Sequence, residues 1–215
     1  FDTRSVCSEG CVNDRVAFFI FSGHKIHFYV NSGHKIESAA NSVSTMGQWY
    51  HVKLQRVSGT STLDLDGASV GSADDTTDYL AGDIELGQYP VNRNYGGYGL
   101  GLDGAIDDIV IRRYGPVMSD ASSGALACPA AGGAQISSDT KKFGAGALAL
   151  DGAGDFVTVA GADNLGTGAF TVDGWFKKDG AFAGSHVYVF DWAKVGGSPR
   201  LRLALGIKVE TTVPV

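Results

Sequence analysis

Hydrophobic and polar residues alternate in many short segments of the chain, and turn-forming residues separate these segments. Clear examples are residues 16–21, 26–30, 48–56, 105–112 and 169–177. Alternation with a period of two predicts β-strands that bury one face. No segment of helical length shows the 3.6-residue period of an amphipathic helix. Short strands at intervals of about 8–12 residues are typical of an all-β sandwich or barrel.

Glycine punctuates this pattern, supplying 31 of the 215 residues, roughly twice its usual share. The Asp66-Gly67 pair stands between two alternating segments and predicts a two-residue hairpin turn. Residues 121–134 are rich in alanine but interrupted by glycine and proline, so we expect a linker there rather than a helix.

Composition narrows the class of protein further. Hydrophobic residues make up 44% of the chain and charged residues 19%, so we expect a folded core rather than disorder. The net charge of −6 argues against a nucleic-acid partner, since binding phosphates needs a basic surface. No run of 18 uncharged apolar residues occurs, so we expect no membrane insertion.

Three cysteines are present. Cys7 and Cys11 bracket a short polar loop. They either form a small disulfide in an oxidising compartment or stay as two free thiols, and both alternatives are open. A zinc site would need about four ligands, and no second cysteine pair exists to supply them. We expect the third, Cys128, to fill space as a small apolar side chain.

Six motifs together resemble a known domain. Three resemble the second part of a laminin-G-like domain, in the concanavalin A-like lectin and glucanase superfamily: WYHV at 49–52, LDLDG at 63–67 and DGAIDDIVI at 103–111. Three resemble the first part of such a domain: FGAGALALDG at 143–152, DFVTV at 155–159 and FTVDGWF at 170–176. The resemblance covers nearly the whole chain. It implies an all-β fold, an antiparallel β-sandwich of the jelly-roll, concanavalin A-like type.

The order of these motifs is unusual, because the usual beginning of the domain follows the usual end. Phe190-Asp191 and the strand at 200–205 resemble Phe1-Asp2 and the strand at 15–20. The two Phe-Asp pairs stand 189 residues apart (190 − 1), about one domain length. We interpret the chain as tandem repeats cut mid-domain, with a circular permutation as the alternative.

This interpretation divides the chain into three parts. Residues 1–115 would be the C-terminal portion of one laminin-G-like repeat, 116–134 a linker, and 135–215 the N-terminal portion of the next repeat. The two portions would close on each other or with neighbouring copies, so self-association or contact between neighbouring repeats is expected. Strand exchange between copies is one way to build a fibre.

The resemblance raises the question of catalysis, because the superfamily includes β-glucanases. Those enzymes carry a Glu-x-Asp-x-(x)-Glu strand that presents two carboxylates for retaining hydrolysis. The nearest match is Asp83-Ile84-Glu85, which lacks the first glutamate. No serine or cysteine stands with a base in a triad pattern, and His51 in the WYHV strand is expected to be structural. We expect no enzymatic activity and no catalytic residues.

Calcium is a cofactor that the resemblance implies, since laminin-G-like domains often hold one Ca²⁺ through carboxylates and loop carbonyls. The candidate ligands are Asp108, Asp107 and Asp151. The alternative is that the Asp-Gly pairs of the chain only form turns. Because Asp107 and Asp108 are neighbours on a strand, only one is expected to face a given side, and one to bind loop amides.

Sugar binding needs exposed aromatic rings beside polar groups on a rim or a concave sheet. The candidate ligand-binding residues lie in one glycine-rich loop: Tyr95, Tyr98, Asn92, Arg93 and Asn94. Trp49, His51 and Lys53 share one strand face and offer a second aromatic surface. For Trp49 and for Trp175, however, core packing is the expected role, and the alternative for the tyrosines is a loop fixed by its own side chains.

Two functions fit these observations. The first is a non-catalytic, extracellular glycan-binding or adhesion module of a tandem-repeat surface protein, with cell-surface carbohydrate as partner. The second is a structural building block without a ligand, in a virion fibre, a capsid decoration or a surface filament. Both place the protein outside the cell, on a cell surface or on a virion surface.

Overall fold

The fold is built from strands, as the alternating pattern predicts. The computed structural model describes residues 16–21, 24–30, 33–79, 82–87, 101–114, 130–162, 165–180, 187–193 and 200–205. Within these residues the structure has fifteen strands and no helix, and so no helix of the length and hydropathy that crossing a membrane requires. Their bounds are β1 (Val16–Phe21), β2 (Lys25–Val30), β3 (Gly33–Glu37), β4 (Trp49–Val57), β5 (Thr60–Leu65), β6 (Ala68–Asp74), β7 (Gly82–Leu86), β8 (Asp103–Tyr114), β9 (Ala130–Ala131), β10 (Gln135–Ser137), β11 (Ala147–Asp151), β12 (Phe156–Ala162), β13 (Ala169–Lys178), β14 (Val187–Ala193) and β15 (Arg200–Leu205).

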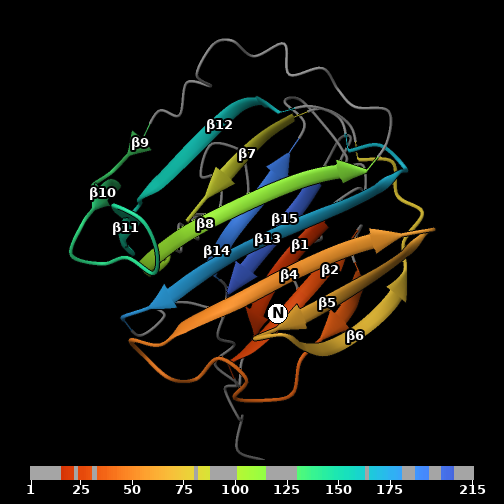
Figure 1. The fold of residues 1–215 in the computed structure, drawn as a ribbon, viewed down its shortest axis with the longest axis horizontal. Coiled ribbons are helices and arrows are strands. Elements are labelled where there is room, and N and C mark those ends of the chain that lie inside the picture. The colour runs from red at the N-terminus through yellow and green to blue at the C-terminus, as the bar shows by residue number, and fades with distance from the viewer. Residues whose placement is uncertain are drawn as a thin grey trace, which may run out of the picture.

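These strands form two sheets that lie face to face (Figure 1). The front sheet has seven strands in the order β10-β11-β8-β13-β4-β5-β6. The back sheet has eight strands; its pairing order is β1-β2-β15-β14-β7-β12-β9, and β3 also pairs with β2. The strand pairs of both sheets are antiparallel. The structure is therefore an antiparallel β-sandwich.

Strands from the two halves of the chain are interleaved within both sheets. In the front sheet β13 lies between β8 and β4, and in the back sheet β7 lies between β14 and β12. Within the described residues, strands from before residue 115 and from after residue 134 thus share both sheets. Their origin in two different repeats stays a prediction. Of the expected linker, residues 116–129 lie outside the described residues, and Ala130–Ala131 form β9.

The core lies between the sheets and follows from the alternation. On β4, Tyr50, Val52 and Leu54 are buried and Trp49, His51 and Lys53 are half-buried on the opposite face. Each fully buried aliphatic or aromatic side chain contributes about 1.5–3 kcal/mol. The core is continuous and includes Phe28, Tyr50, Leu63, Leu102, Ile106, Leu150, Phe170, Val172, Phe176 and Phe190.

Two tight turns set the register of β4, β5 and β6. Ser58-Gly59 joins β4 to β5 and Asp66-Gly67 joins β5 to β6, and all four residues have positive φ. Positive φ at both central residues is the requirement of the hairpin turn that matches strand twist. The Asp66-Gly67 prediction is therefore confirmed. The turn also creates β6, which its small polar residues did not predict.

Four buried side chains lie together at the edge of this core, and two of them are charged. We call them the inner cluster: Arg56, Asp75, Tyr79 and Phe170. The Arg56 side chain is fully buried and donates hydrogen bonds to the carbonyl oxygens of Thr77 (2.7 Å) and Gly168 (3.0 Å). Its guanidinium lies 3.6 Å from Asp75 Oδ2 and 4.8 and 4.7 Å from the ring centroids of the two aromatic members.

The carboxylate of the inner cluster is satisfied by several donors. Asp75 accepts hydrogen bonds from Ser61 Oγ (2.7 Å) and from the Tyr79 hydroxyl (2.9 Å). The backbone N–H of Thr77 also donates to it (3.2 Å). A buried ion pair stays favourable only when such hydrogen bonds offset its lost hydration.

Candidate functional site

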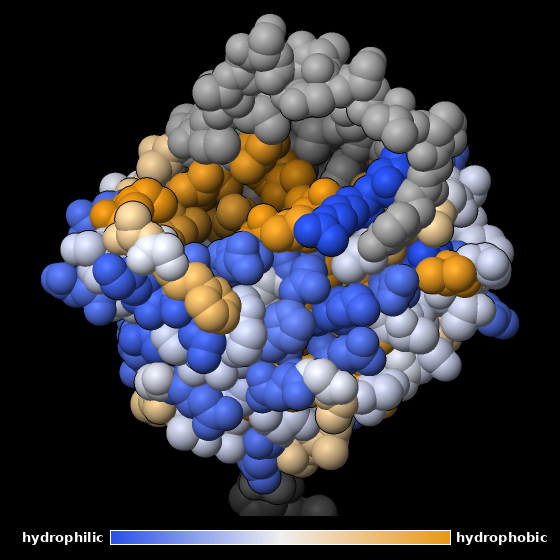
Figure 2. All heavy atoms as spheres, viewed as in Figure 1, coloured by the Kyte–Doolittle hydropathy of each residue, from blue (hydrophilic) through white to orange (hydrophobic). Residues whose placement is uncertain are grey.

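A hollow of about 260 Å³ opens on the outer face of the front sheet. Its lining comes from the outward-facing residues of β4, β8 and β13: His51, Asp108, Val110, Arg112, Thr171, Asp173 and Trp175. Figure 2 shows that hydrophilic residues cover most of this face of the molecule. The volume is slightly below the roughly 300–1,000 Å³ of typical small-molecule pockets. It suits one small polar unit rather than a large apolar ligand.

Trp175 forms the aromatic wall of the hollow. Its ring stacks on the His51 ring, with centroids 4.8 Å apart and planes 28° from parallel. Phe143 meets it edge-on at 5.6 Å, and Lys142 Nζ lies 4.4 Å from its centroid. The Trp175 side chain is therefore fixed in place although it stands on the outside of the sheet.

The expected core packing of Trp49 and Trp175 is wrong. Both are half-buried on the outer face of the front sheet. The reason lies in the next residue of each strand. Tyr50 and Phe176 are buried in the core, where their rings stack 5.5 Å apart. Because neighbouring residues of a strand point to opposite faces, each tryptophan must face outward.

His51 and Asp173 form the polar floor of the hollow. His51 Nε2 lies 2.5 Å from Asp173 Oδ1, and both side chains are partly exposed. The backbone N–H of His51 donates to Asp66 Oδ1 at 2.7 Å, which ties the strand to the β5–β6 turn. The histidine thus supports Trp175 and orients Asp173. We call His51, Asp173, Trp175 and Phe143 the outer cluster.

A bulge in β8 brings two neighbouring aspartates to the same side of the sheet. The register between β8 and β13 shifts between Asp173 and Trp175, and Asp108 has a φ of +51°. Asp107 lies opposite Trp175, and Asp108 lines the hollow. The expectation that only one of the pair faces a given side is wrong, because the extra residue of a bulge breaks the alternation.

Asp107 holds the loop that carries Phe143. Its Oδ2 accepts hydrogen bonds from the backbone N–H groups of Lys142 (2.7 Å) and Phe143 (2.9 Å). The prediction that one aspartate of the pair binds loop amides is confirmed for Asp107. The loop at 142–143 is therefore fixed against Trp175 by a carboxylate from β8.

The third candidate calcium ligand, Asp151, lies at the end of β11 and pairs with Asp103 of β8. Burial, and then the negative charges of Asp179 and Asp151, raise the pKa of Asp103. Within the described part of the chain, no three histidine, cysteine, aspartate or glutamate residues are grouped to hold a metal ion. The structure does not gather Asp107, Asp108 and Asp151 into one such group, and calcium stays a prediction.

The other predicted site residues lie outside the described residues. These are the loop residues Tyr95, Tyr98, Asn92, Arg93 and Asn94 and the cysteines Cys7, Cys11 and Cys128. Asp83 and Glu85, the nearest match to the glucanase motif, lie on β7, but their side chains are not among those described.

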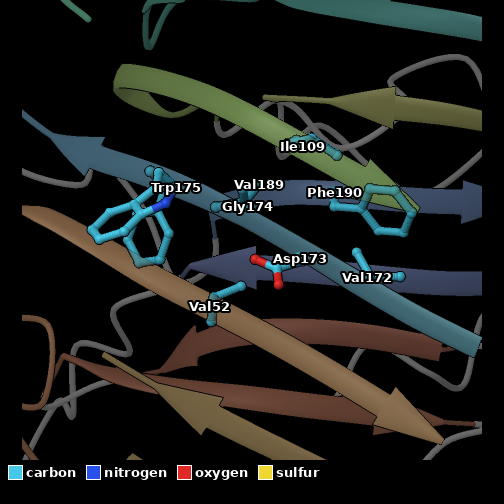
Figure 3. Close-up of a pocket in the computed structure, with 9 residues that line it drawn as sticks. Val52, Ile109, Val172, Asp173, Gly174, Trp175, Val189 and Phe190 are labelled. Atoms are coloured by element: carbon cyan, nitrogen blue, oxygen red, sulfur yellow. The ribbon is translucent and has the colours of Figure 1, made fainter. Parts of the chain in front are cut away.

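A second space lies inside the sandwich, behind β13. It measures about 10 Å³, which is room for one water molecule at most. Figure 3 shows Val172 and Gly174 of β13 beside it, with Val189 and Phe190 of β14 in the other layer. This space is a small packing defect, too small for a sugar, so the outer hollow is the stronger candidate.

Sequence reasoning gave no sugar-binding role to three residues that line the hollow: Arg112, Thr171 and Asp173. Each alternates with a core residue, and each lies on a strand that was predicted. A signal was available, because Thr171, Asp173 and Trp175 occupy every second position of β13. Their meeting with His51 depends on β13 pairing with β4, which is a long-range contact.

Comparison with known proteins agrees with the sandwich. The family model described as the concanavalin A-like lectin/glucanases superfamily matches residues 2–120. No curated protein and no solved structure matches the chain. Because the family model covers more than half of the chain and the structure has the two antiparallel sheets of that fold, the chain belongs to the concanavalin A-like lectin and glucanase superfamily.

Proposed function

We propose that the protein is a non-catalytic glycan-binding module, and that it holds one sugar unit in the hollow on the outer face of the front sheet. Membership of a superfamily whose domains often bind carbohydrate supports this function. The observation that carries it is the composition of the hollow: an ordered aromatic ring beside a carboxylate, a guanidinium and a hydroxyl.

The chemistry of a sugar matches this arrangement. One face of a pyranose is a patch of C–H groups, which packs against the rings of Trp175 and His51. Its hydroxyl groups both donate and accept hydrogen bonds. Asp173 accepts from them, the Arg112 guanidinium donates to them, and the Thr171 hydroxyl can do either. The ordered ring loses little conformational freedom when a ligand binds.

Binding fits the site better than hydrolysis. Two carboxylates, Asp108 and Asp173, line the hollow. Asp173 Oδ1 already lies within hydrogen-bond distance of His51 Nε2. The hydrolases of the superfamily carry both carboxylates on one strand, whereas Asp108 and Asp173 lie on two strands, β8 and β13. We therefore infer that a bound glycan leaves the site uncut.

A glycan array probed with the full chain tests the proposal. We expect binding to a defined set of glycans, lost by at least tenfold in Arg112→Ala and in Asp173→Asn. Arg113→Ala is the matched control, because it removes the same charge from the next residue without touching the hollow, and it should bind like the parent. Equal binding by all three variants would place the ligand elsewhere, and Tyr95→Ala and Tyr98→Ala would then test the glycine-rich loop.

Two further outcomes separate the remaining alternatives. Release of reducing sugar from a bound glycan, lost in Asp108→Asn, would contradict the non-catalytic assignment. A calcium requirement, seen as glycan binding lost in chelator and restored by Ca²⁺, would support Asp107, Asp108 or Asp151 as ligands. Absence of binding to any glycan, together with ordered assemblies in electron micrographs, would favour a building block of a virion fibre, capsid decoration or surface filament.

A further inference from the structure

Strand β2 has three partners in the back sheet. It pairs antiparallel with β3, with β1 and with β15. A strand has only two hydrogen-bonding edges, one on each side. Two of the three partners must therefore share one edge.

The hydrogen bonds at Ile26 show which edge is taken by β3. The Ile26 backbone N–H donates to Ser38 Oγ, and its carbonyl accepts from the Ser38 N–H, both at 2.9 Å. Successive residues of a strand present their backbone groups to opposite edges. His27 and Tyr29 therefore present theirs to the other edge. Because β1 contacts both β15 and β14, we place β1 and β15 together at this edge.

The two strands meet this edge in the same register. Phe19 of β1 and Ala204 of β15 both lie opposite His27. Ala17 and Arg202 both lie opposite Tyr29. Each residue of β15 thus stands 185 positions after its counterpart in β1 (202 − 17).

The two strands also stand 185 positions apart in their sequence likeness, four fewer than the 189 between the two Phe-Asp pairs. The resemblance between the strands at 15–20 and 200–205 aligns Arg15 with Arg200, which again stand 185 positions apart (200 − 15). Register in the sheet and likeness in the sequence therefore identify the same residue pairs. In space, β1 also contacts β15 and β14, although β2 and β15 stand between β1 and β14 in the pairing order.

We propose that β1 and β15 are interchangeable occupants of one place, between β14 and β2, and that this place accepts the equivalent strand of a second copy of the chain. β15 fills it by pairing with both β14 and β2. The chain then carries one strand more than its sheet can pair. An unpaired strand is a template for pairing with another chain, and an element shared between identical chains is exchanged at low cost.

A second copy of the chain is the occupant that fits. Its β1 and β15 can pair with β2 in the register that β1 and β15 of the first copy already share. The equivalent strand of an adjoining repeat has the same chemistry and fits by the same rule. The place is thus a strand-exchange site, at which sandwiches close either within one chain or between chains. This inference is independent of glycan binding.

Proline variants of the full chain test the interchangeability. Proline removes the backbone N–H that faces β2, so Phe19→Pro disables β1 and Ala204→Pro disables β15. Each single variant should keep its thermal midpoint within about 2 °C of the parent, and the double variant should lose about 5 °C or more. Single losses that add up to the loss of the double variant would overturn the proposal, since both strands would then be needed at once.

Mixing the full-length chains tests the exchange. The double variant has an empty place and the parent has a spare strand, so the two should form a one-to-one complex in light scattering and native mass spectrometry. Phe19→Pro is the matched control, because it uses its one competent strand itself and should not bind the double variant. No complex with the parent would overturn the exchange between copies.

Hydrogen exchange gives a readout that does not depend on the double variant folding. In a monodisperse monomer of the parent, the amides of β1 and of β15 should each be only partly protected. When one of the two strands carries proline, the amides of the other should gain protection. Full protection of both strands in a monomer would show two separate places in the sheet and overturn the proposal.

Discussion

The inner cluster and the outer cluster are built from similar parts and differ in exposure. Each combines a basic side chain, an aspartate and two aromatic rings, and each involves strands β4 and β13. In the inner cluster the side chains of the ion pair are fully buried, whereas in the outer cluster His51 and Asp173 are 26% and 35% exposed. The same kinds of residue therefore serve stability in one place and remain open to a ligand in the other.

The difference follows from what surrounds each charge. Inside, Arg56 and Asp75 have lost their water, and only the hydrogen bonds of the protein compensate. Outside, water already solvates part of His51 and Asp173, so the attraction between the two side chains is weak. Both side chains can therefore form hydrogen bonds to a sugar hydroxyl. Substitutions in the two clusters should consequently have effects of very different size.

The largest effect is expected for Arg56→Met. This change removes the cation but leaves the Asp75 carboxylate buried without it, and breaking a buried pair costs about 3–5 kcal/mol. The free energy of unfolding from urea titration measures the loss. Lys53→Met on the outer face of the same strand is the control and should lose little. An Arg56→Met loss below 1 kcal/mol would mean that the two clusters are energetically alike.

A smaller loss is expected for Tyr79→Phe, which removes the hydroxyl that donates to Asp75. The unsatisfied acceptor costs about 1–3 kcal/mol. Burial, and then the negative charge of Asp75, raise the pKa of Tyr79 well above its usual 10.0. The raised pKa of Tyr79 in the folded state contributes stability that is fully present below pH 10, the pKa of the unfolded chain. This stability is lost as the pH rises above 10.

Chemical denaturation between pH 8 and pH 11 tests this dependence. The parent should lose stability above pH 10 more steeply than Tyr79→Phe does. Parallel curves for the two proteins would show that Tyr79 does not titrate with unfolding.

The smallest effect is expected in the outer cluster. His51→Ala removes a partly exposed pair, and such pairs contribute less than about 1 kcal/mol. Its unfolding free energy should stay near that of the parent, while near-ultraviolet circular dichroism should report a less ordered Trp175. A loss as large as that of Arg56→Met would remove the distinction between the clusters.

Much of the fold could be predicted from local pattern. The alternation in β4, β8 and β13 and the Asp66-Gly67 turn identified strands and a hairpin, because period and turn chemistry are local properties. β6, β9 and β10 were not predicted, since they are short or made of small polar residues. They form because a turn or a neighbouring strand brings them beside a sheet edge.

The site was harder to predict, because it is made of residues from distant strands. The alternation on β4 separated His51 from Tyr50, and Asp107 bound loop amides as expected. The expectation that Trp175 packs in the core was wrong. It rested on the size of the ring and did not consider that the neighbouring Phe176 is buried. The bulge at Asp108 has no signal in the alternating pattern that could have shown it.

The central place of β13 in the front sheet has a consequence for how the protein is made. β4 ends at Val57 and β13 begins at Ala169, so 111 residues must be synthesised between them (169 − 57 − 1). At ribosomal rates of about 5–20 residues per second, β4 waits roughly 6–22 s for the strand that joins it to β8. Folding is therefore dominated by contacts that are distant in sequence and is expected to be slow. Until β13 emerges, the growing chain has two separate sheet edges that a chaperone would have to cover.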